Sequence, residues 1–327
     1  MSAPHKVAVL GASGYSGQVL CELIKRDSQF ELFSSAGRQD DPAELLGKCE
    51  VVFLCLPHEA SLEWAPKFLK AGASVVDLSG AFRLKTSSYP QWYGFDHGEP
   101  KLLSEAIYGL QPFAQIPQRK KNEPPVLVAN PGCYSTAVQL LLQPLLKAGL
   151  IESSNISLSA KSGVTGAGRK ATTELLFSEL YASYSPYKTG KHQHWPEIVE
   201  GLRTFASGVS VSPTFVTELI PIDRGILVTA FLDWKKDLAA GDRSINAIEA
   251  AWSEAYKSDS GFRLAKDDAA MNVKKVRGTN HFALRAVEAY GRIVAFSSID
   301  NLMRGAASQA LMNGARILGV EWREENF

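Results

Sequence analysis

A glycine-rich turn near the N-terminus is the feature that most constrains the fold of this chain. Residues 6–10 form an apolar run typical of a buried strand, and residues 18–25 have the apolar spacing of a helix. Between them lie Gly11, Gly14 and Gly17, in the spacing G-x-x-G-x-x-G. This order is typical of a dinucleotide site, where a pyrophosphate approaches backbone N–H groups at the helix start. The commoner spacing is G-x-G-x-x-G, so a plain strand-to-helix turn remains the alternative.

The following segments predict the sheet that would present this turn. Apolar runs at residues 30–33, 51–56 and 74–77 alternate with helical stretches, which predicts an α/β fold with a doubly wound, Rossmann-type parallel sheet. Ligands of such sheets lie beyond the carboxyl ends of the strands, so Pro57 and Ser79 are predicted cofactor contacts. The predicted contacts in the turn itself are Gly11, Ser13, Gly14, Tyr15, Ser16 and Gly17.

The end of the second strand predicts the type of cofactor. An NAD site usually has an acidic residue near this point, which binds the ribose 2′-hydroxyl. This chain instead has Ser35 and Arg38, which suit a 2′-phosphate. We therefore predict NADP(H), with both residues among its contacts. The alternative for Arg38 is a solvated loop charge.

Cys133 is the candidate nucleophile. The apolar run 126–129 predicts a buried strand, and the spacing of apolar residues from Ala137 to Leu146 predicts a helix that ends near Gly149. Cys133 would then lie at a helix N-terminus, where backbone N–H groups and the helix dipole should lower its pKa. A small apolar cysteine packed under the sheet is the alternative, and position alone does not decide between them.

The second half of the chain has a different pattern. Alternating runs at residues 156–161, 209–219 and 225–234, and two more near 281–288 and 292–298, predict a mostly antiparallel sheet with helices on one face. The glycine-rich loop 162–169, followed by a helix beginning near Lys170, could hold an anion or act as a flexible turn. The small residues of the last helix predict that it returns to the first domain.

These patterns predict two domains. The first is an NADP-binding domain of residues 1–132, joined by the C-terminal helix 301–327, and the second is a catalytic and oligomerisation α+β domain of residues 133–300. The outer face of the second sheet has many apolar positions, which predicts a homodimer or homotetramer.

Two histidines, His192 and His194, suit acid–base chemistry near neutral pH. Surface histidines without a role, and zinc ligands, are the alternatives. No nearby cysteine or further histidine completes a ligand set, so we predict no metal site. Glu197 would orient a histidine or interact favourably with the helix dipole. Arg83, which follows a predicted strand, is a possible anion contact, although a structural role is the commoner one.

Composition excludes some partners and favours a compartment. The formal net charge is +1, which argues against a nucleic-acid partner, and no apolar run reaches the length of a membrane span. The four cysteines show no Cys-x-x-Cys spacing, which favours free thiols in a reducing cytoplasm.

Several separated motifs together resemble one family. They are the glycine-rich turn 11–17, Val-Asp-Leu-Ser-Gly-Ala-Phe-Arg-Leu at 76–84, Asn-Pro-Gly-Cys-Tyr at 130–134, Ser-Gly-Val-Thr-Gly-Ala-Gly-Arg at 162–169, His-Gln-His-Trp-Pro-Glu-Ile at 192–198 and Ile-Asp-Asn-Leu-Met-Arg-Gly-Ala-Ala at 299–307. The chain resembles the N-acetyl-gamma-glutamyl-phosphate reductases of arginine biosynthesis, within the aspartate-semialdehyde dehydrogenase-like group. It departs from that family at Gly80-Ala81, where Ala-Asp is frequent, and at Gln193 and Trp195, where Arg and Thr are frequent.

The resemblance implies a thioester mechanism. Cys133 would attack an acyl phosphate and release inorganic phosphate, and NADPH would reduce the thioester to a semialdehyde. His194 would be the acid–base group, with His192 as the second candidate or a substrate contact. The further implied contacts are Asn130, Arg83, Lys161 and Glu197 with substrate, and Gly163 and Asn301 with the cofactor.

Three alternatives remain open. The same chemistry could act on another acyl phosphate, such as an aspartyl or N-acetyl-aminoadipyl phosphate, because Gln193 and Trp195 could reshape the pocket. A non-catalytic NADP-binding sensor could retain the fold. A phosphate-independent aldehyde dehydrogenase would also use a cysteine, but it would make a free acid.

Overall fold

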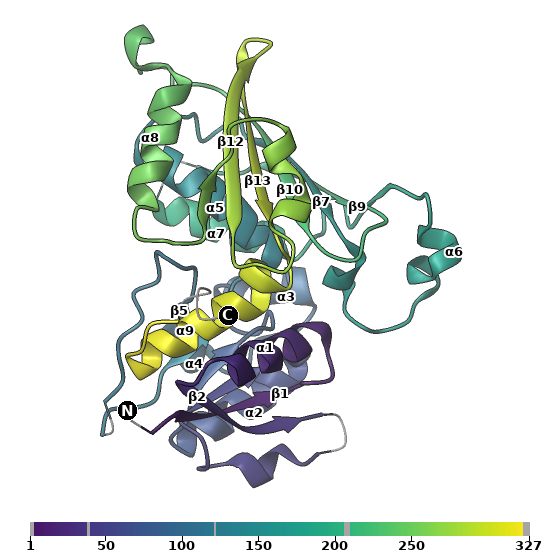
Figure 1. Cartoon of the computed structure of the whole chain (residues 1–327), viewed down its shortest axis with the longest axis vertical. Helices are drawn as coiled ribbons and strands as arrows, with labels where there is room; N and C mark the ends of the chain where they lie inside the picture. Colours follow the sequence, from purple (N-terminus) through teal and green to yellow (C-terminus); the bar gives the residue numbers. More distant parts are fainter. Residues whose placement is uncertain (1–2, 38–39, 121, 206–209, 323–327) are drawn as a thin grey trace. The chain divides into compact units, whose positions relative to one another are not determined.

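The computed structural model describes residues 3–37, 40–120, 122–205 and 210–322 (Figure 1). The chain divides into two compact units. The first consists of Met1–Gly132 together with Gly305–Phe327, and the second is Cys133–Arg304. Each unit contains its own sheet. None of the helices within the described ranges is long and apolar enough to cross a membrane.

The sheet of the first unit is parallel and doubly wound, as predicted. In the described residues its strand order is β2-β1-β3-β4-β6-β5. Its strands are β1 (His5–Leu10), β2 (Phe30–Ala36), β3 (Val51–Leu54), β4 (Ser74–Asp77), β5 (Ile107–Tyr108) and β6 (Leu127–Ala129). The chain goes from β1 to β2 on one side and then returns to β3 on the other. The strand order therefore reverses at β1, and such a switch point is where open α/β sheets bind ligands.

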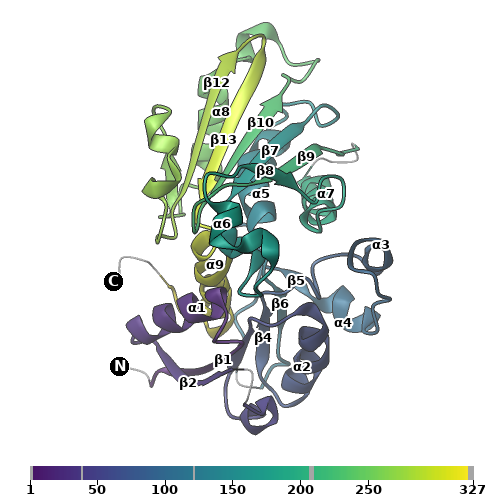
Figure 2. The ribbon, with the colours of Figure 1, turned by 90° about the vertical axis from the view of Figure 1, so that its right-hand side faces the viewer.

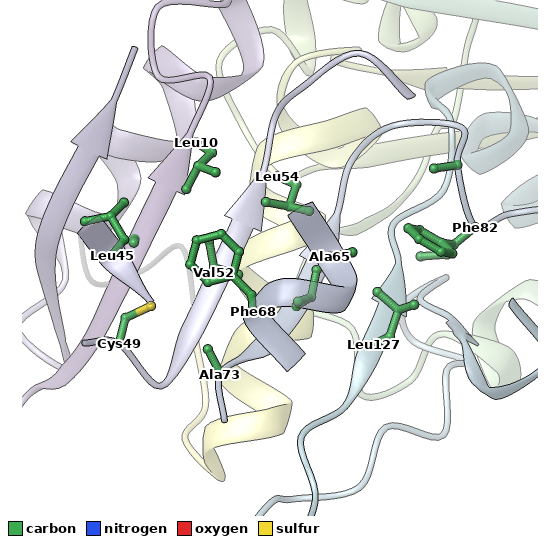
Figure 3. Close-up of a cluster of buried hydrophobic side chains, with 14 of the residues drawn as sticks. Leu10, Leu45, Cys49, Val52, Leu54, Ala65, Phe68, Ala73, Phe82 and Leu127 are labelled. Atoms are coloured by element: carbon green, nitrogen blue, oxygen red, sulfur yellow. The ribbon is translucent and has the colours of Figure 1, made fainter. Parts of the chain in front are cut away.

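Helices enclose this sheet because its central strands are apolar on both faces. They are α1 (Tyr15–Arg26), α2 (His58–Lys70), the short α3 (Tyr89–Tyr93) and α4 (Pro100–Glu105), and α9 (Ser308–Leu318). Figure 3 shows one side of the core, where Val52 and Leu54 of β3 lie by Ala65 and Phe68 of α2. The C-terminal helix α9 packs against α1 and β4, as the prediction of a returning helix requires.

The sheet of the second unit is mixed and mostly antiparallel. Its order in the described residues is β11-β12-β13-β10-β7-β9-β8, and the succession from β12 to β8 can be followed in Figure 2. The strands are β7 (Ser157–Ser162), β8 (Ser185–Tyr187), β9 (Thr214–Leu219), β10 (Ile226–Leu232), β11 (Phe262–Leu264), β12 (Phe282–Ala289) and β13 (Arg292–Ile299). Two neighbouring pairs, β7 with β9 and β11 with β12, are parallel.

Three helices pack on one face of the second sheet. They are α5 (Cys133–Lys147), which contacts β10 and β13, α7 (His194–Phe205), which packs on α5, and α8 (Ile245–Ala255), which contacts β12. The short α6 (Phe177–Leu180) lies on an arm that extends from this sheet (Figure 1). A small cluster around Met271 and Ala283 covers part of the other face.

Two predictions about the second unit are wrong in detail. No helix begins near Lys170, because Gly168 has a φ of 80° and the chain forms only short 3₁₀ turns at Val164–Ala167 and Thr173–Leu175. The strand predicted from residue 209 begins at Thr214, after Pro213, which lacks the N–H that a ladder needs. Residue 209 itself is outside the described ranges.

The last helix begins as a π-helix at Met303–Ala307 before α9.

Candidate active site

The glycine-rich turn has the backbone geometry of a phosphate cradle. A Cβ on Gly11, whose φ is 80°, would lie 2.2 Å from the Cys55 carbonyl oxygen. A Cβ on Gly17 would lie 2.3 Å from the Gly11 carbonyl oxygen. Gly14 is the N-cap of α1, no side chain caps the helix there, and its first turn has no acidic residue. The glycines of the turn therefore pack closely against backbone carbonyl groups. The N-terminus of α1, with no acidic residue in its first turn, is suited to binding an anion.

The other residues predicted to contact the cofactor from the first unit follow neighbouring strands. Ser35 is exposed at the end of β2, Pro57 is the N-cap of α2 beyond β3, and Ser79 follows β4. These positions lie at the carboxyl ends of adjacent parallel strands, the edge at which the glycine-rich turn also lies. Arg38 lies outside the described residues.

Ser79 is engaged in its own turn. Its hydroxyl donates to Asp77 Oδ2 over 2.8 Å and accepts from the Ala81 N–H over 3.0 Å. Asp77 is fully buried, and burial raises the pKa of its carboxyl, opposed by hydrogen bonds from Ser61 and Ser79. A cofactor contact at Ser79 would therefore have to use its backbone or share its hydroxyl.

Asn130 and Arg83 hold the segment that leads to Cys133. Asn130 is buried; its Oδ1 accepts from Asn313 Nδ2 over 2.9 Å, and its Nδ2 donates to the Ala306 carbonyl over 3.3 Å. Arg83 Nε donates to the Asn130 carbonyl over 2.8 Å, and Arg83 Nη2 donates to the Leu78 carbonyl over 2.6 Å. Both side chains thus brace the β4 and β6 ends of the first unit, and their contacts with substrate stay predictions.

Cys133 lies where the sequence predicts it, at a strand-to-helix turn. β6 ends at Ala129, and Cys133 is the first residue of α5, whose first turn has no acidic residue. Its side chain is half-buried. It lines a cavity of about 590 Å³ within the second unit. A thiol at this position is accessible and faces the positive end of a helix dipole.

The cavity joins four separate stretches of the second unit. Besides Cys133 and Tyr134, it is lined by Ser162, Gly163, Gly166, Ala167, Lys170, Thr172, Glu174 and Leu175, and by Tyr187, Lys188, His192, Gln193, His194 and Leu219. Both predicted histidines therefore share a cavity with the predicted nucleophile, although about 60 residues separate them in the chain.

An aromatic cluster orients the histidines. The His192 and His194 ring centroids are 4.9 Å apart, and Tyr134 lies edge-on to both, at 5.4 Å from His192 and 6.0 Å from His194. The Tyr187 hydroxyl donates to the Tyr134 hydroxyl over 3.0 Å. The Tyr134 hydroxyl in turn donates to the Ala160 carbonyl oxygen over 3.3 Å. Burial raises the pKa of both tyrosines, so they remain neutral.

His192 is a neutral imidazole. Burial lowers its pKa to about 2, helped by the nearby charges of His194 and Lys188 and opposed by Glu197. The His194 backbone N–H donates to His192 Nδ1 over 3.1 Å, so Nδ1 is the acceptor and Nε2 carries the proton. His192 therefore fixes the first turn of α7 and cannot act as a cation near neutral pH. Glu197, also in this first turn, is buried.

Lys161 points away from the cavity. It alternates along β7 with Ala160 and Ser162, the buried positions that face the helices. Its ammonium pairs with Glu218 over 3.4 Å and donates to the Ser159 hydroxyl. Lys161 therefore lies on the other face of the sheet, and we do not assign it a contact with a substrate in the Cys133 cavity.

Asn301 and Gly163 belong to one clamp around the glycine-rich loop of the second unit. Asn301 accepts from the Gly225 N–H over 2.7 Å and donates to Thr165 Oγ1 over 3.0 Å. A Cβ on Gly163 would lie 2.7 Å from the Arg224 backbone nitrogen. The Asn301 amide therefore holds the loop that lines the cavity, and its contact with the cofactor stays a prediction.

Sequence reasoning missed Tyr187, Lys170 and Lys188 as cavity residues. Lys188 Nζ donates to Gln193 Oε1 over 2.9 Å, and its φ of 47° is unusual for a residue other than glycine. Two lysines that flank a glycine-rich loop and a histidine pair could have indicated an anion site. Among the residues that the structure describes, no group of three or more His, Cys, Asp or Glu side chains could hold a metal ion.

Comparison with known proteins agrees with this fold. Residues 35–118 match the model of the semialdehyde dehydrogenase NAD-binding domain, and residues 133–301 match that of the semialdehyde dehydrogenase dimerisation domain. Aspartate semialdehyde dehydrogenase II of Vibrio cholerae, complexed with ASA, has a TM-score of 0.67 at 15% identity, covering 97% of this chain and 99% of that one. The Candida albicans enzyme with NADP has a TM-score of 0.65 at 14% identity, with the same coverage. The fold and the two matched domains are therefore those of a semialdehyde dehydrogenase.

Comparison of sequences narrows this class. The N-acetyl-gamma-glutamyl-phosphate reductases of Bacillus cereus (strain 03BB102) and Bacillus anthracis are each 36% identical to this chain, over 97% of its length and 96% of theirs. The chain belongs to the N-acetyl-gamma-glutamyl-phosphate reductase family, a group of oxidoreductases with an NAD(P)-binding domain.

Proposed function

We propose that this chain reduces N-acetyl-L-glutamyl 5-phosphate with NADPH, giving N-acetyl-L-glutamate 5-semialdehyde and inorganic phosphate, in arginine biosynthesis. The observation that carries the proposal is the cavity in which the thiol at the start of α5 meets the histidine at the start of α7. The names of the relatives, which are 36% identical, supply the substrate.

The first half of the reaction is acyl transfer to Cys133. The Cys133 thiolate attacks the carbonyl carbon of the acyl phosphate and forms a C–S bond. The tetrahedral adduct collapses with cleavage of the bond to the phosphate oxygen, and inorganic phosphate leaves with that electron pair. The helix N-terminus stabilises the thiolate, and backbone N–H groups there are suited to the negative oxygen of the adduct.

The second half converts the thioester to the aldehyde. Bound NADPH supplies a hydride for the thioester carbon. His194 donates a proton to the resulting oxyanion and takes it back when the C–S bond breaks, which restores the Cys133 thiolate. His192, neutral and bonded to the His194 backbone, positions this group and is not itself the acid.

The cations of the cavity suit an anionic substrate. Lys170 and Lys188 line it, whereas Lys161 does not, so we assign the contacts with phosphate or carboxylate to the first two. Arg83 and Asn130 brace the turn before Cys133 instead of binding substrate. Ser13, Tyr15 and Ser16 beside the glycines, together with Ser35, Pro57 and Arg38, remain our proposed contacts with NADP(H).

We further propose a cytoplasmic homodimer or homotetramer. The matched domain carries the name of a dimerisation domain, and the sheet face away from α5 has the exposed Phe231 near the end of the central strand β10. Apolar side chains on an open sheet face favour burial against a second copy. Light scattering that gives a monomer at working concentration would contradict this.

The test is the reverse reaction, followed by the absorbance of NADPH. N-acetylglutamate 5-semialdehyde, NADP⁺ and inorganic phosphate should yield NADPH, and omission of phosphate or the Cys133→Ser substitution should abolish it. Aspartate and N-acetyl-aminoadipate semialdehydes serve as controls for the substrate. Turnover of one of those alone would assign a different acyl phosphate, and phosphate-independent turnover would indicate an aldehyde dehydrogenase that makes acid.

A further inference from the structure

The helices α5 and α7 begin at the two groups to which we assign the chemistry. Cys133 is the first residue of α5, and His194 is the first residue of α7. Near these ends the Tyr134 and His194 rings are 6.0 Å apart, and farther along both helices Gln143 approaches Gly201. The helices therefore run side by side in the same direction. The displacement of α7 along α5 then determines the separation of the thiol and the imidazole.

A ladder of buried polar side chains runs along this helix contact. Gln139 Nε2 donates to Ser135 Oγ over 2.6 Å, and Gln143 Nε2 donates to Gln139 Oε1 over 2.7 Å. Gln143 Nε2 also lies 3.5 Å from the Gly201 carbonyl oxygen of α7. These α5 side chains are buried on a helix that is otherwise largely apolar. A buried amide that loses its partners is costly, so the ladder strongly favours one arrangement.

Gly201 leaves room for the Gln139 amide because it has no side chain. A Cβ there would lie 2.0 Å from Gln139 Oε1 and 2.5 Å from Gln139 Cδ. Glycine inside a helix is less favourable than alanine, so its presence at this position calls for a reason. The close approach of the Gln139 amide, and not a special φ, gives the physical reason for glycine at this position.

We propose that the contact between Gln139 and Gly201 sets the register of α7 on α5, and so the separation of Cys133 Sγ from the His194 imidazole. The inference rests on the proposed function in taking these two groups as a reacting pair. Apolar contacts are non-directional, so they resist sliding less than a hydrogen-bonded ladder does. A slip of one residue moves a helix by about 1.5 Å, and a misplacement of about 1 Å can cost roughly 100-fold in rate. Gln139 and Gly201 are thus positioning residues.

The test is a double-mutant cycle in the full-length protein. Gly201→Ala places a methyl group against the Gln139 amide, and Gln139→Ala vacates that space. We expect Gly201→Ala to lower kcat about 10- to 100-fold, with the KM for NADPH unchanged. Gln139→Ala with Gly201→Ala should recover part of that loss, so the two effects should not be additive.

Two further variants separate register from stability. Gln139→Met removes the hydrogen bonds of the ladder while nearly preserving the volume of the side chain. Leu141→Met is the control, because Leu141 is also buried on α5 but lies on another side of the helix, where its carbonyl accepts a hydrogen bond from Trp252 of α8. Gln139→Met should lower kcat about tenfold, and Leu141→Met should leave kcat within about twofold at a comparable change in Tm. Equal loss of kcat in both variants, or additive effects in the cycle, would overturn the proposal.

A substrate-independent readout distinguishes this inference from the proposed function. The rate of alkylation of Cys133 by iodoacetamide, measured against pH, reports the thiol and its neighbour without turnover. Its midpoint should shift in Gly201→Ala and return toward that of wild type in the double variant. An unchanged midpoint of the alkylation–pH curve in all variants would contradict the proposal that Gln139 and Gly201 set the register of α7 on α5. Failure of every semialdehyde as a substrate would count against the proposed function alone.

Discussion

The glycine-rich turn of the first unit and the Cys133 cavity of the second are built in different ways. The turn is one continuous stretch of the chain, and its geometry comes from backbone and from missing side chains. The cavity combines four stretches, around Cys133, the loop after β7, the segment from Tyr187 to His194, and Leu219 of β9, and its chemistry lies in side chains. A contiguous backbone site can be found from spacing alone, whereas a composite side-chain site requires the fold.

The largest effect should come from the nucleophile. Cys133→Ser keeps the size of the side chain but replaces a thiolate with a poorly ionised hydroxyl, so kcat should fall by at least about 10³-fold. Steady-state turnover measures this, and binding of NADPH by fluorescence titration should remain near the wild-type value. Retained turnover in the variant would contradict the thioester mechanism at Cys133.

A smaller effect should follow from filling the turn of the first unit. In Gly17→Ala the new Cβ would lie 2.3 Å from the Gly11 carbonyl oxygen, whereas in Gly14→Ala it would lie at 3.4 Å. We expect Gly17→Ala to raise the Kd for NADPH about tenfold or more, because the cradle must open to accept the methyl group. Gly14→Ala, the matched control, should change Kd less. Equal Kd values for the two variants would contradict a phosphate cradle at this turn.

The two histidines should differ in their effect on turnover. His194→Gln should lower kcat about 10²-fold or more, because it removes the group that exchanges a proton with the oxyanion. His192→Gln should lower kcat less and leave the shape of the kcat–pH profile unchanged, because burial already holds the pKa of His192 at about 2. A larger loss of kcat in His192→Gln than in His194→Gln would reverse the two assignments.

The depressed pKa of His192 also makes a prediction about stability. The unfolded chain binds a proton at His192 below a pH of about 6.5 and the folded chain does not, so this residue destabilises the fold increasingly as the pH falls. At pH 5 this amounts to about 2 kcal/mol. Relative to wild type, His192→Gln should therefore gain stability between pH 8 and pH 5 in urea unfolding. If the variant and the wild type differed in free energy of unfolding by the same amount at pH 8 and at pH 5, His192 would be accessible to protons in the folded state.

The smallest effect should come from the cavity rim. Lys188→Met removes an exposed ammonium, so we expect the KM for the acyl phosphate to rise about three- to tenfold, with kcat little changed. Lys188→Arg is the control that keeps the charge. The effect should weaken at high salt, and equal KM values for the two variants at low salt would exclude a charge contact at Lys188.

Much of the fold was predictable because its signals are local. Strand and helix periodicity, the spacing of Gly11, Gly14 and Gly17, and the strand-to-helix position of Cys133 depend on neighbours a few residues away. The helix predicted near Lys170 failed for an equally local reason, since Gly168 and short turns interrupt it. The substrate contact that the resemblance implies for Lys161 stays a prediction, and alternation along β7 turns that side chain to the face opposite Ser162, which lines the cavity.

Local sequence patterns were enough to predict the parallel sheet, the glycine-rich turn and the placement of a cysteine at a helix N-terminus. The folded structure, in contrast, sets which polar side chains are already engaged. Asn130 is held by Asn313, 183 residues along the chain, and Asn301 by Thr165 across 136 residues. It also decided that His192 is neutral, because burial, which no local pattern specifies, sets its pKa. Hydrogen-bond partners and desolvation arise from contacts distant in sequence, and those contacts exist only in the folded chain.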